Sequence, residues 1–356
     1  MTSATDTALD TARSDGPATG RRPLGRAPDG SPVEALWIGQ AGTRARIMTW
    51  GATLMDLRLD GIGHSLVLGS PDLAPYLGPM RDFGAVVGPV ANRIAGASAP
   101  LGGRRLALEA NEAGRTMLHG GAAGCSVRNW RIESESATAC RLGLSLPEGT
   151  GGLPGPLTLR ASYSIEDDGA LEILLEGESG ALTFCNLAPH GYWCLYGSGT
   201  LDAHLLEIAA RTYLPVDAAL IPLGSPVPVA GTRFDFRRPR PVRAPGDAPL
   251  DHNFCLGDAS GRLRPACRLS VPGIALDLST TEPGLQVYDG GGIDTGPFPG
   301  HHGRPYRAHA GLALEPQRWP DAPNRPDYPS VLLRPGETCR QLSRFHPRRI
   351  GAPGPG

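Results

Sequence analysis

The sequence predicts an all-β protein that folds as a large antiparallel β-sandwich, and three observations support this fold class. The 356 residues include 49 glycines and 36 prolines, which is too many for a helical protein and typical of short strands joined by turns. Several segments alternate apolar and polar residues with a period of two, as half-buried strands do. No long stretch keeps a helical spacing of three to four without an interrupting glycine or proline.

The predicted strands lie in a single domain, which we place at residues 23–346. Arg44–Thr49 alternates small or apolar residues with polar ones, and a Gly-Ala-Thr turn leads from it into a second strand at Leu54–Leu59. Residues 1–22 are rich in Thr, Ala, Ser, Asp and Gly without periodicity, so we expect a disordered leader there. Residues 347–356 carry two arginines and then a glycine- and proline-rich run, which indicates a flexible tail.

Two hairpins are predicted in the second half of the domain. Residues 157–164 and 170–177 flank Asp167-Asp168-Gly169, and an Asp-Gly pair between two alternating segments is a strong hairpin signal. The second hairpin turns at Pro272-Gly273, with alternating leucine, valine and isoleucine residues on both sides.

Charge and cysteine usage exclude several classes of protein. The formal net charge is -1 and no run of basic residues occurs, which argues against nucleic acid or an anionic membrane as the main partner. No window has the apolar length of a membrane span, and the first residues lack the apolar core of a signal peptide. The seven cysteines are widely spaced without a Cys-x-x-Cys pair, so we expect mostly buried free thiols and a cytoplasmic protein.

Candidate functional residues stand next to turn-forming residues or within apolar runs. Glycine beside a polar residue lets the backbone approach a ligand closely. The five segments of interest are Asn92-Arg93, Leu118-His119-Gly120-Gly121, Pro189-His190-Gly191-Tyr192-Trp193, Asp251-His252-Asn253-Phe254 and Gly311-Leu312-Ala313-Leu314-Glu315-Pro316-Gln317.

Each segment also has a structural explanation without function. A histidine beside glycine is often a turn residue, and an Asp-His-Asn run is often a loop with Asx turns. Arg93 can pair with a surface carboxylate, and the rings of Tyr192 and Trp193 can belong to the core. Glu315 is different, because a carboxylate that faces the core must be paired, hydrogen-bonded or functional.

Other common sites find little support in the sequence. His301-His302 and His309 cluster loosely, and His252 follows Asp251, but no His-x-x-x-His or His-Glu-x-x-His pattern occurs. Gly290-Gly291-Gly292 is not followed by Lys-Ser or Lys-Thr, as a phosphate-binding loop requires. A Gly-x-Ser-x-Gly elbow is also absent. We therefore expect neither a metal nor a nucleotide cofactor.

Taken in order, these segments resemble the aldose 1-epimerase (galactose mutarotase) family over nearly the whole chain, from about Pro23 to Phe345. A single such motif is weak, whereas many in one order are specific. The matching motifs are Gly51-Ala52-Thr53, Phe83 to Ile94, Leu118-His119-Gly120-Gly121 with Trp130, His190-Gly191-Tyr192-Trp193, Pro215-Val216-Asp217, Ile221 to Gly224, Val229 to Phe236, Asp251-His252-Asn253-Phe254, Thr280 to Gln286, Leu314-Glu315-Pro316-Gln317, Pro320 to Asn324, and Leu333 to Glu337.

The resemblance implies a β-super-sandwich with few short helices, a solvent-reachable sugar cleft and no cofactor. By position, Glu315 is the general base that takes a proton from the anomeric hydroxyl, and His190 is the general acid that protonates the ring oxygen. The ring then opens to the aldehyde and closes on the other face. The positions that hold the sugar or orient this pair are Asn92, Arg93, His119, Tyr192, Asp251 and Gln286. The partner is a small aldose, and the protein is expected to be a monomer or a homodimer.

Several positions depart from the pattern of the family. Pro89 replaces the first Arg of its Gly-Arg-x-Ala-Asn-Arg segment, and Pro189 and Gly191 flank the predicted acid in place of Asn and of Ser or Thr. Trp193 and Cys194 replace Phe-Asn. None of these changes removes a predicted catalytic residue, but they leave the preferred sugar open.

Three other functions remain as alternatives. A non-catalytic carbohydrate-binding or sensing protein is expected to lack the acid or the base, and both are present here. An epimerase for an unusual or phosphorylated aldose is the second alternative. A version that binds a phosphorylated sugar is expected to add a basic cluster near the motifs, and the sequence has no extra one there. A glycoside hydrolase needs two carboxylates across one bond, for which Asp251 and Glu315 are the candidates.

Overall fold

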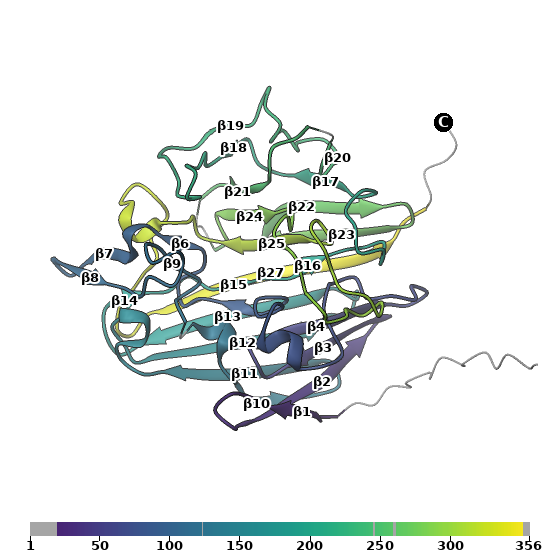
Figure 1. The fold of residues 1–356 in the computed structure, drawn as a ribbon, viewed down its shortest axis with the longest axis horizontal. Coiled ribbons are helices and arrows are strands. Elements are labelled where there is room, and N and C mark those ends of the chain that lie inside the picture. The colour runs from purple at the N-terminus through teal and green to yellow at the C-terminus, as the bar shows by residue number, and fades with distance from the viewer. Residues whose placement is uncertain (1–19, 123, 245, 259–260, 352–356) are drawn as a thin grey trace, which may run out of the picture.

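The computed structural model describes residues 20–122, 124–244, 246–258 and 261–351, and its named strands all pair antiparallel (Figure 1). The largest sheet has nine strands. In spatial order they are β10 (Arg131–Glu135), β11 (Ala139–Leu146), β12 (Leu157–Ile165), β13 (Leu171–Ser179), β27 (Thr338–Arg349), β23 (Ile274–Thr280), β22 (Arg264–Val271), β17 (Leu205–Ile208) and β20 (Arg240–Pro241).

Two smaller sheets lie against the nine-stranded sheet. The six-stranded sheet consists, in spatial order, of β16 (Tyr192–Trp193), β25 (Leu312–Gln317), β24 (Gly284–Tyr288), β21 (Asp251–Cys255), β18 (Thr212–Tyr213) and β19 (Val227–Pro228). The four-stranded sheet consists of β1 (Arg22–Arg26), β2 (Pro32–Gln40), β3 (Thr43–Met48) and β4 (Thr53–Leu59).

Short elements connect these sheets. Four two-stranded sheets pair β14 (Thr183–Phe184) with β26 (Leu332–Leu333), β15 (Ala188–Pro189) with β5 (Val86–Val87), β6 (Arg93–Ile94) with β9 (Met117–Leu118), and β7 (Ser98–Leu101) with β8 (Arg104–Ala107). The helices in the described part of the chain are 3₁₀ turns, namely η1 (Ala74–Leu77), η2 (Ala95–Ala97), η3 (Cys125–Val127), η4 (Thr150–Gly152) and η5 (Ala322–Asn324). None of the helices in the described residues is long and apolar enough to span a membrane.

The main core lies between the nine-stranded sheet and the two smaller sheets. Strand β12 alternates buried and half-buried residues along its whole length, so its apolar side chains point to one face. Leu159 and Tyr163 of this strand belong to the same buried cluster as Leu314 of β25 and Ile47 of β3. The predicted β-sandwich is therefore confirmed, with its second layer divided between two sheets.

Both predicted hairpins are present. Strands β12 and β13 pair over their full length around the Asp-Gly turn, and β22 pairs with β23 around Gly273. The strands predicted at Arg44–Thr49 and Leu54–Leu59 correspond to β3 and β4. Period-two patterning next to a turn signal was sufficient to place these elements.

The last strand continues past the predicted start of the flexible tail. Pro347–Arg349 pair with residues 274–276 of β23, and Ile350 N–H donates to Gly273 O at 3.0 Å. The partner strand lies about seventy residues earlier, so composition near the end of the chain could not indicate this pairing. Strand β27 therefore ends at Arg349, within the segment predicted to be a tail. At the other end, β1 begins at Arg22, and the predicted leader lies otherwise almost entirely outside the described residues.

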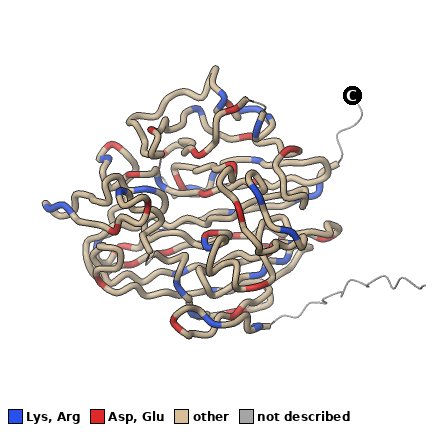
Figure 2. The backbone as a smooth tube through the Cα atoms, in the orientation of Figure 1, with Lys and Arg blue, Asp and Glu red and all other residues tan. Residues whose placement is uncertain are grey.

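Charged residues of both signs are interspersed over the backbone (Figure 2), in keeping with the net charge of -1. Arg, Asp and Glu alternate along neighbouring strands and form many ion pairs, such as Arg268 with Asp277 across β22 and β23.

The central position of β12 in the core gives a prediction for stability. Leu159→Ala should lower the free energy of unfolding by about 2–5 kcal/mol, because the side chain is fully buried and its loss leaves a cavity. Urea unfolding followed by tryptophan fluorescence measures the change. Leu223→Ala is the matched control, since Leu223 is 64% exposed and its truncation should cost less than about 0.5 kcal/mol. Equal losses in the two variants would contradict this assignment of the core.

Candidate active site

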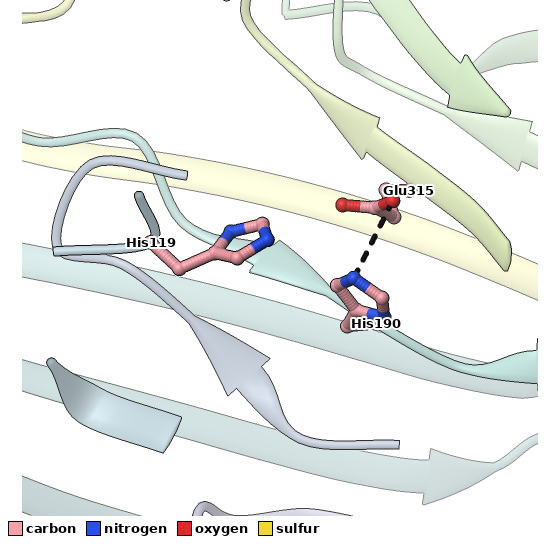
Figure 3. A group of neighbouring side chains, drawn as sticks. All are labelled: His119, His190 and Glu315. Carbon is pink, nitrogen blue, oxygen red and sulfur yellow. Dashed lines mark ion pairs between the residues drawn. The ribbon is translucent and has the colours of Figure 1, made fainter. Parts of the chain in front are cut away.

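His190 and Glu315 face each other (Figure 3). Nε2 of His190 lies 3.6 Å from Oε1 of Glu315, and the two residues are only 5% and 2% exposed. His190 occupies the turn between β15 and β16, and Glu315 lies on β25, which pairs with β16. The turn is fixed by two backbone hydrogen bonds, from His190 N–H to Ala85 O (2.8 Å) and from Gly84 N–H to His190 O (2.9 Å).

The alternation of side chains along paired strands explains why polar groups gather here. Glu315 of β25, Gln286 of β24 and Asn253 of β21 lie directly opposite one another. Residues that pair directly point to the same face of a sheet, and their neighbours along each strand point to the other. The neighbours Leu314 and Val287 belong to the main core. One face of this sheet therefore packs in the core, and the other carries the site.

Asp251 is held on the same face by an amide and an arginine. Gln286 Nε2 donates to Asp251 Oδ1 at 2.5 Å, and Arg93 Nη1 lies 3.8 Å from Asp251 Oδ2. Arg93 also donates from Nε and Nη2 to Glu112, at 2.9 Å and 2.8 Å. This bidentate pair fixes the plane of the guanidinium. Burial raises the pKa of Asp251, and the charge of Arg93 opposes this rise.

His119 contributes a second imidazole next to His190. Their ring centroids are 5.3 Å apart with an edge-to-face arrangement. His119 and Asn92 both adopt left-handed backbone conformations, with φ of 52° and 63°. Such conformations are costly for residues other than glycine and are common at functional sites. They allow Asn92 N–H to donate to His119 Nδ1 at 3.1 Å.

The hydrogen bond from Asn92 fixes the proton on the His119 ring. Because Nδ1 accepts a hydrogen bond, the neutral ring carries its proton on Nε2. Burial, with a further contribution from the charge of His190, lowers the pKa of His119 to about 3. His119 is therefore a neutral hydrogen-bond donor at physiological pH. The Asn92 side chain accepts a hydrogen bond from Arg93 N–H at 2.8 Å, so Asn92 orients its neighbours.

Burial also sets the protonation of Glu315. It raises the pKa of this carboxyl to about 7; the charge of His190 opposes the rise and that of Asp251 adds to it. Oε2 of Glu315 and Nδ1 of His190 are buried and have no hydrogen-bond partner among the described residues. The arrangement thus holds a carboxyl that titrates near neutrality beside an imidazole, as acid–base catalysis requires.

The same cluster can be considered as a metal site. His119, His190 and Glu315 each offer one atom within 4.8 Å of the others. A metal ion needs a free lone pair on each imidazole. His119 uses its lone pair to accept the hydrogen bond from Asn92 and presents a proton at Nε2. The cluster therefore suits proton transfer and hydrogen bonding better than metal binding.

Of the two aromatic candidates, the structure places Tyr192 at the site. Its ring centroid is 5.1 Å from that of His190 and 4.5 Å from that of Phe83. Trp193 points to the opposite face and stacks on Phe345 in the core, with ring centroids 4.8 Å apart. Consecutive residues of a strand point to opposite faces, so only one of the two rings can belong to the site.

The sequence interpretation singled out neither Asn253 nor Gln317 as a site residue. Asn253 Oδ1 and both polar atoms of Gln317 are buried without a partner in the described structure. Gln317 is two residues beyond Glu315 on β25 and therefore shares its face. The signal was present in the spacing: Asn253 is two positions after Asp251, and Gln317 is two positions after Glu315. A strand assignment for both segments would have revealed it.

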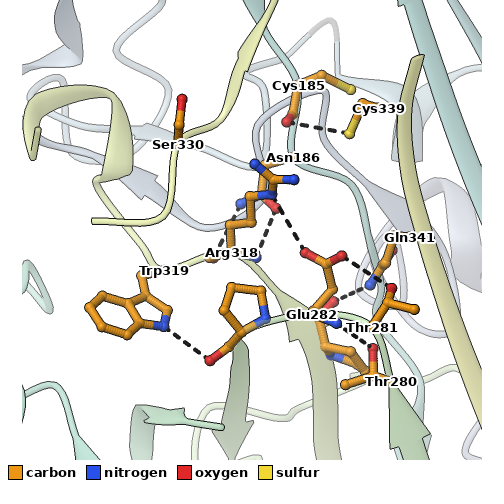
Figure 4. Close-up of polar contacts among 12 residues, drawn as sticks. Cys185, Asn186, Thr280, Thr281, Glu282, Arg318, Trp319, Ser330, Cys339 and Gln341 are labelled. Carbon is orange, nitrogen blue, oxygen red and sulfur yellow. Dashed lines mark hydrogen bonds and ion pairs between the residues drawn. The ribbon is translucent and has the colours of Figure 1, made fainter. Parts of the chain in front are cut away.

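A network of polar contacts supports the end of β25 (Figure 4). The side chain of Asn186 accepts a hydrogen bond from Arg318 N–H at 3.0 Å and donates to Arg318 O at 3.3 Å. The Arg318 side chain in turn lies 3.8 Å from Glu282, whose pKa is raised to about 7 by burial. We call the paired contacts between Asn186 and Arg318 the amide clamp. It fixes the backbone three residues beyond Glu315.

Comparisons of sequence and of structure relate this chain to known proteins. The sequence model of the aldose 1-epimerase family matches residues 35–346. Human galactose mutarotase is 37% identical over 328 residues, which cover 89% of this chain and 94% of that protein. Aldose 1-epimerase of Escherichia coli strain K12 is 32% identical over 336 residues, covering 90% and 96%. An aldose epimerase homologue from C. elegans has a similar structure, with a TM-score of 0.82, 28% identity and coverage of 89% and 100%.

The raised pKa of Glu315 predicts a stability cost that depends on pH. Its folded-state pKa of about 7 lies above the ordinary glutamate value of 4.5, so ionisation is harder in the folded state. The cost is absent below the unfolded-state pKa, grows as pH rises between these values, and is complete above the folded-state pKa. Glu315→Gln removes it and should increase the free energy of unfolding by about 2–3 kcal/mol more at pH 8 than at pH 4.5. Urea unfolding at the two pH values tests this, and a difference that is independent of pH would contradict it.

Proposed function

Because this chain belongs to the aldose 1-epimerase family, we propose that it interconverts the α and β anomers of a free aldose, with Glu315 as general base and His190 as general acid. The observation that carries this proposal is the 3.6 Å separation of His190 Nε2 and Glu315 Oε1 at the polar face of the six-stranded sheet. A base and an acid this close can act on two oxygens bonded to one carbon.

In the proposed reaction, the Glu315 carboxylate takes the proton of the anomeric hydroxyl while His190 donates a proton to the ring oxygen. The bond between the anomeric carbon and the ring oxygen breaks, and a free aldehyde forms. Rotation about the bond between C1 and C2 presents the other face of the carbonyl. During ring closure Glu315 returns its proton to the carbonyl oxygen, and His190 takes back the proton from the hydroxyl that re-forms the ring. The reaction changes no oxidation state and transfers no group, so an acid and a base suffice.

The protonation states of the site support these roles. A general base works best when its pKa lies near the working pH, and burial brings Glu315 to about 7. His119 stays neutral and can donate only from Nε2, so it can bind a sugar oxygen without competing as the proton donor. Asp251, Gln286 and Arg93 offer the charged and amide groups that recognise hydroxyls.

The charge arrangement favours a neutral sugar over a phosphorylated one. Arg93 already pairs with Glu112 and lies close to Asp251, so its charge is largely balanced. A phosphate group placed beside Arg93 would lie close to the carboxylates of Glu112 and Asp251, which would repel it. The name of the human relative, galactose mutarotase, makes α-D-galactose the first substrate to test, and α-D-glucose is the second aldose for comparison. The seven cysteines, all unpaired in the structure, support the expectation of a reducing, cytoplasmic setting.

Polarimetry tests the activity directly. Purified protein should speed the relaxation of freshly dissolved α-D-galactose to its equilibrium rotation. Glu315→Gln and His190→Asn should each lower kcat by about 10²–10⁴-fold, since each removes one proton-transfer group. Glu148→Gln, an exposed residue, and His346→Asn, on β27, are matched controls that should retain activity. Acceleration that survives in the folded Glu315 and His190 variants would refute the assignment. No acceleration of any aldose would favour the carbohydrate-binding alternative.

The pH profile tests the role of Glu315 separately. Activity requires the ionised carboxylate, so kcat/KM should fall as pH drops through about 7. The charge of Asp251 helps raise the pKa of Glu315, so Asp251→Asn should move this acidic limb to lower pH even though sugar binding weakens. The profile is measured by polarimetry after subtraction of the uncatalysed rate at each pH. An acidic limb at the same pH in both proteins would contradict the assignment.

A further inference from the structure

Cys185 and Cys339 form a pair of neighbouring thiols outside the acid–base site. Cys185 lies between β14 and β15, and Cys339 is the second residue of β27. They are 154 residues apart in sequence, yet Cys339 Sγ lies 3.7 Å from the carbonyl oxygen of Cys185 (Figure 4). Cys185 is buried, whereas Cys339 is partly accessible to solvent. All seven cysteines of the chain are free in the structure.

Gly177 brings the two thiols close together. It pairs directly with Cys339 across β13 and β27. A Cβ atom placed on Gly177 would lie 2.6 Å from Cys185 Sγ and 3.9 Å from Cys185 Cβ, so Cys185 occupies the space above this glycine. Directly opposed residues of an antiparallel pair have Cβ atoms about 4.5–5.5 Å apart. Both cysteines therefore lie next to the same glycine, and their side chains are hydrogen-bonded to each other, so the two sulfur atoms are neighbours.

The electrostatic surroundings make the two thiols unequal. A hydrogen bond from Cys185, with a further contribution from the charge of Arg318, lowers the pKa of Cys339. The same contact, together with burial, raises the pKa of Cys185. Burial raises the pKa of the thiols of Cys140 and Cys255 to about 12. The thiolate is the reactive form of cysteine, so the pair has one favoured nucleophile and one resolving partner.

We propose that Cys185 and Cys339 are a site of reversible oxidation by hydroperoxides, at which Cys339 reacts first and a Cys185–Cys339 disulfide forms. The Cys339 thiolate attacks one oxygen of hydrogen peroxide, the O–O bond breaks, and Cys339 becomes a sulfenic acid as hydroxide leaves. The Cys185 sulfur then attacks the Cys339 sulfur and expels water. Overall, the two thiols lose two electrons and two protons, and the peroxide is reduced to two molecules of water. The site is independent of the sugar chemistry.

The disulfide would join β27 to the segment that carries the amide clamp. Cys185 directly precedes Asn186, which holds the backbone of Arg318 through two hydrogen bonds. The covalent link would close a loop of more than 150 residues, since the two cysteines are 154 positions apart. Closing a long loop restricts the unfolded chain, so the oxidised protein should unfold at a higher urea concentration than the reduced protein.

Peptide mapping of the full-length wild-type protein is the primary test. The reduced protein is treated with hydrogen peroxide, the remaining thiols are alkylated, and the protein is digested without a reductant. We expect a peptide that links Cys185 to Cys339, a mass loss of two hydrogens in the intact protein, and the reversal of both by dithiothreitol. The proposal is overturned if both cysteines are recovered in alkylated form, or if the disulfide joins other cysteines.

Two variants test the order of the steps. In Cys185→Ser, the sulfenic acid on Cys339 has no resolving partner and should be trapped by dimedone. In Cys339→Ser, Cys185 should stay reduced under the same treatment. Cys267→Ser, which removes a buried thiol in the main core, is the matched control and should still form the link. Faster labelling of Cys185 than of Cys339 would contradict the proposed order, and this readout does not depend on sugar turnover.

Discussion

The site depends on strand β25, which packs one face into the apolar core and turns its other face towards the polar site. Leu312 and Leu314 point into the main core, while Glu315 points to the opposite face. The carboxylate cannot move to solvent without turning the whole strand and exposing those leucines. Register with β24 then places Gln286 beside Glu315, and pairing with β16 brings the turn that carries His190. The alternation of side chains along β25, together with its pairing to β16, therefore positions both the proposed base and the proposed acid.

This placement has an energetic cost that the remainder of the fold must offset. A buried carboxyl whose pKa rises to about 7 is less stable as an anion than it would be in water. Several buried polar atoms around it lack partners in the described structure, including Glu315 Oε2, Gln286 Oε1 and Asn253 Oδ1. Each unsatisfied group costs about 1–3 kcal/mol. A sugar bears many hydroxyls, so binding would supply the missing hydrogen bonds, and the cost becomes a source of specificity.

Local backbone geometry completes the arrangement. Asn92 and His119 both adopt left-handed conformations, and the hydrogen bond that these permit fixes the proton of His119 on Nε2. Pro189 and Gly191, which depart from the family pattern, leave the backbone of His190 held by hydrogen bonds to residues 84 and 85. The turn is thus anchored through its main chain, so the backbone position of His190 does not depend on the side chains of its two neighbours.

The sequence alone indicated the all-β class, the strands that became β3, β4, β12, β13, β22 and β23, both hairpins, and the segments from which the proposed acid and base come. Period-two patterns mark β12, β13, β22 and β23 because each strand has one buried face and is bounded by a strong turn signal. The order of motifs indicated the family, and with it the roles proposed for His190 and Glu315. These features are local in the chain, or they recur in a fixed order along it.

Only the tertiary structure decided which way each side chain faces. The structure placed Tyr192 at the site and Trp193 in the core. It also added Asn253 and Gln317 to the polar face and extended β27 to Arg349. It also placed Cys185 next to Cys339. These outcomes depend on register between strands that lie far apart in sequence. A shift of one residue in that register would reverse every side chain on a strand, and no local pattern records which register the partner strand imposes.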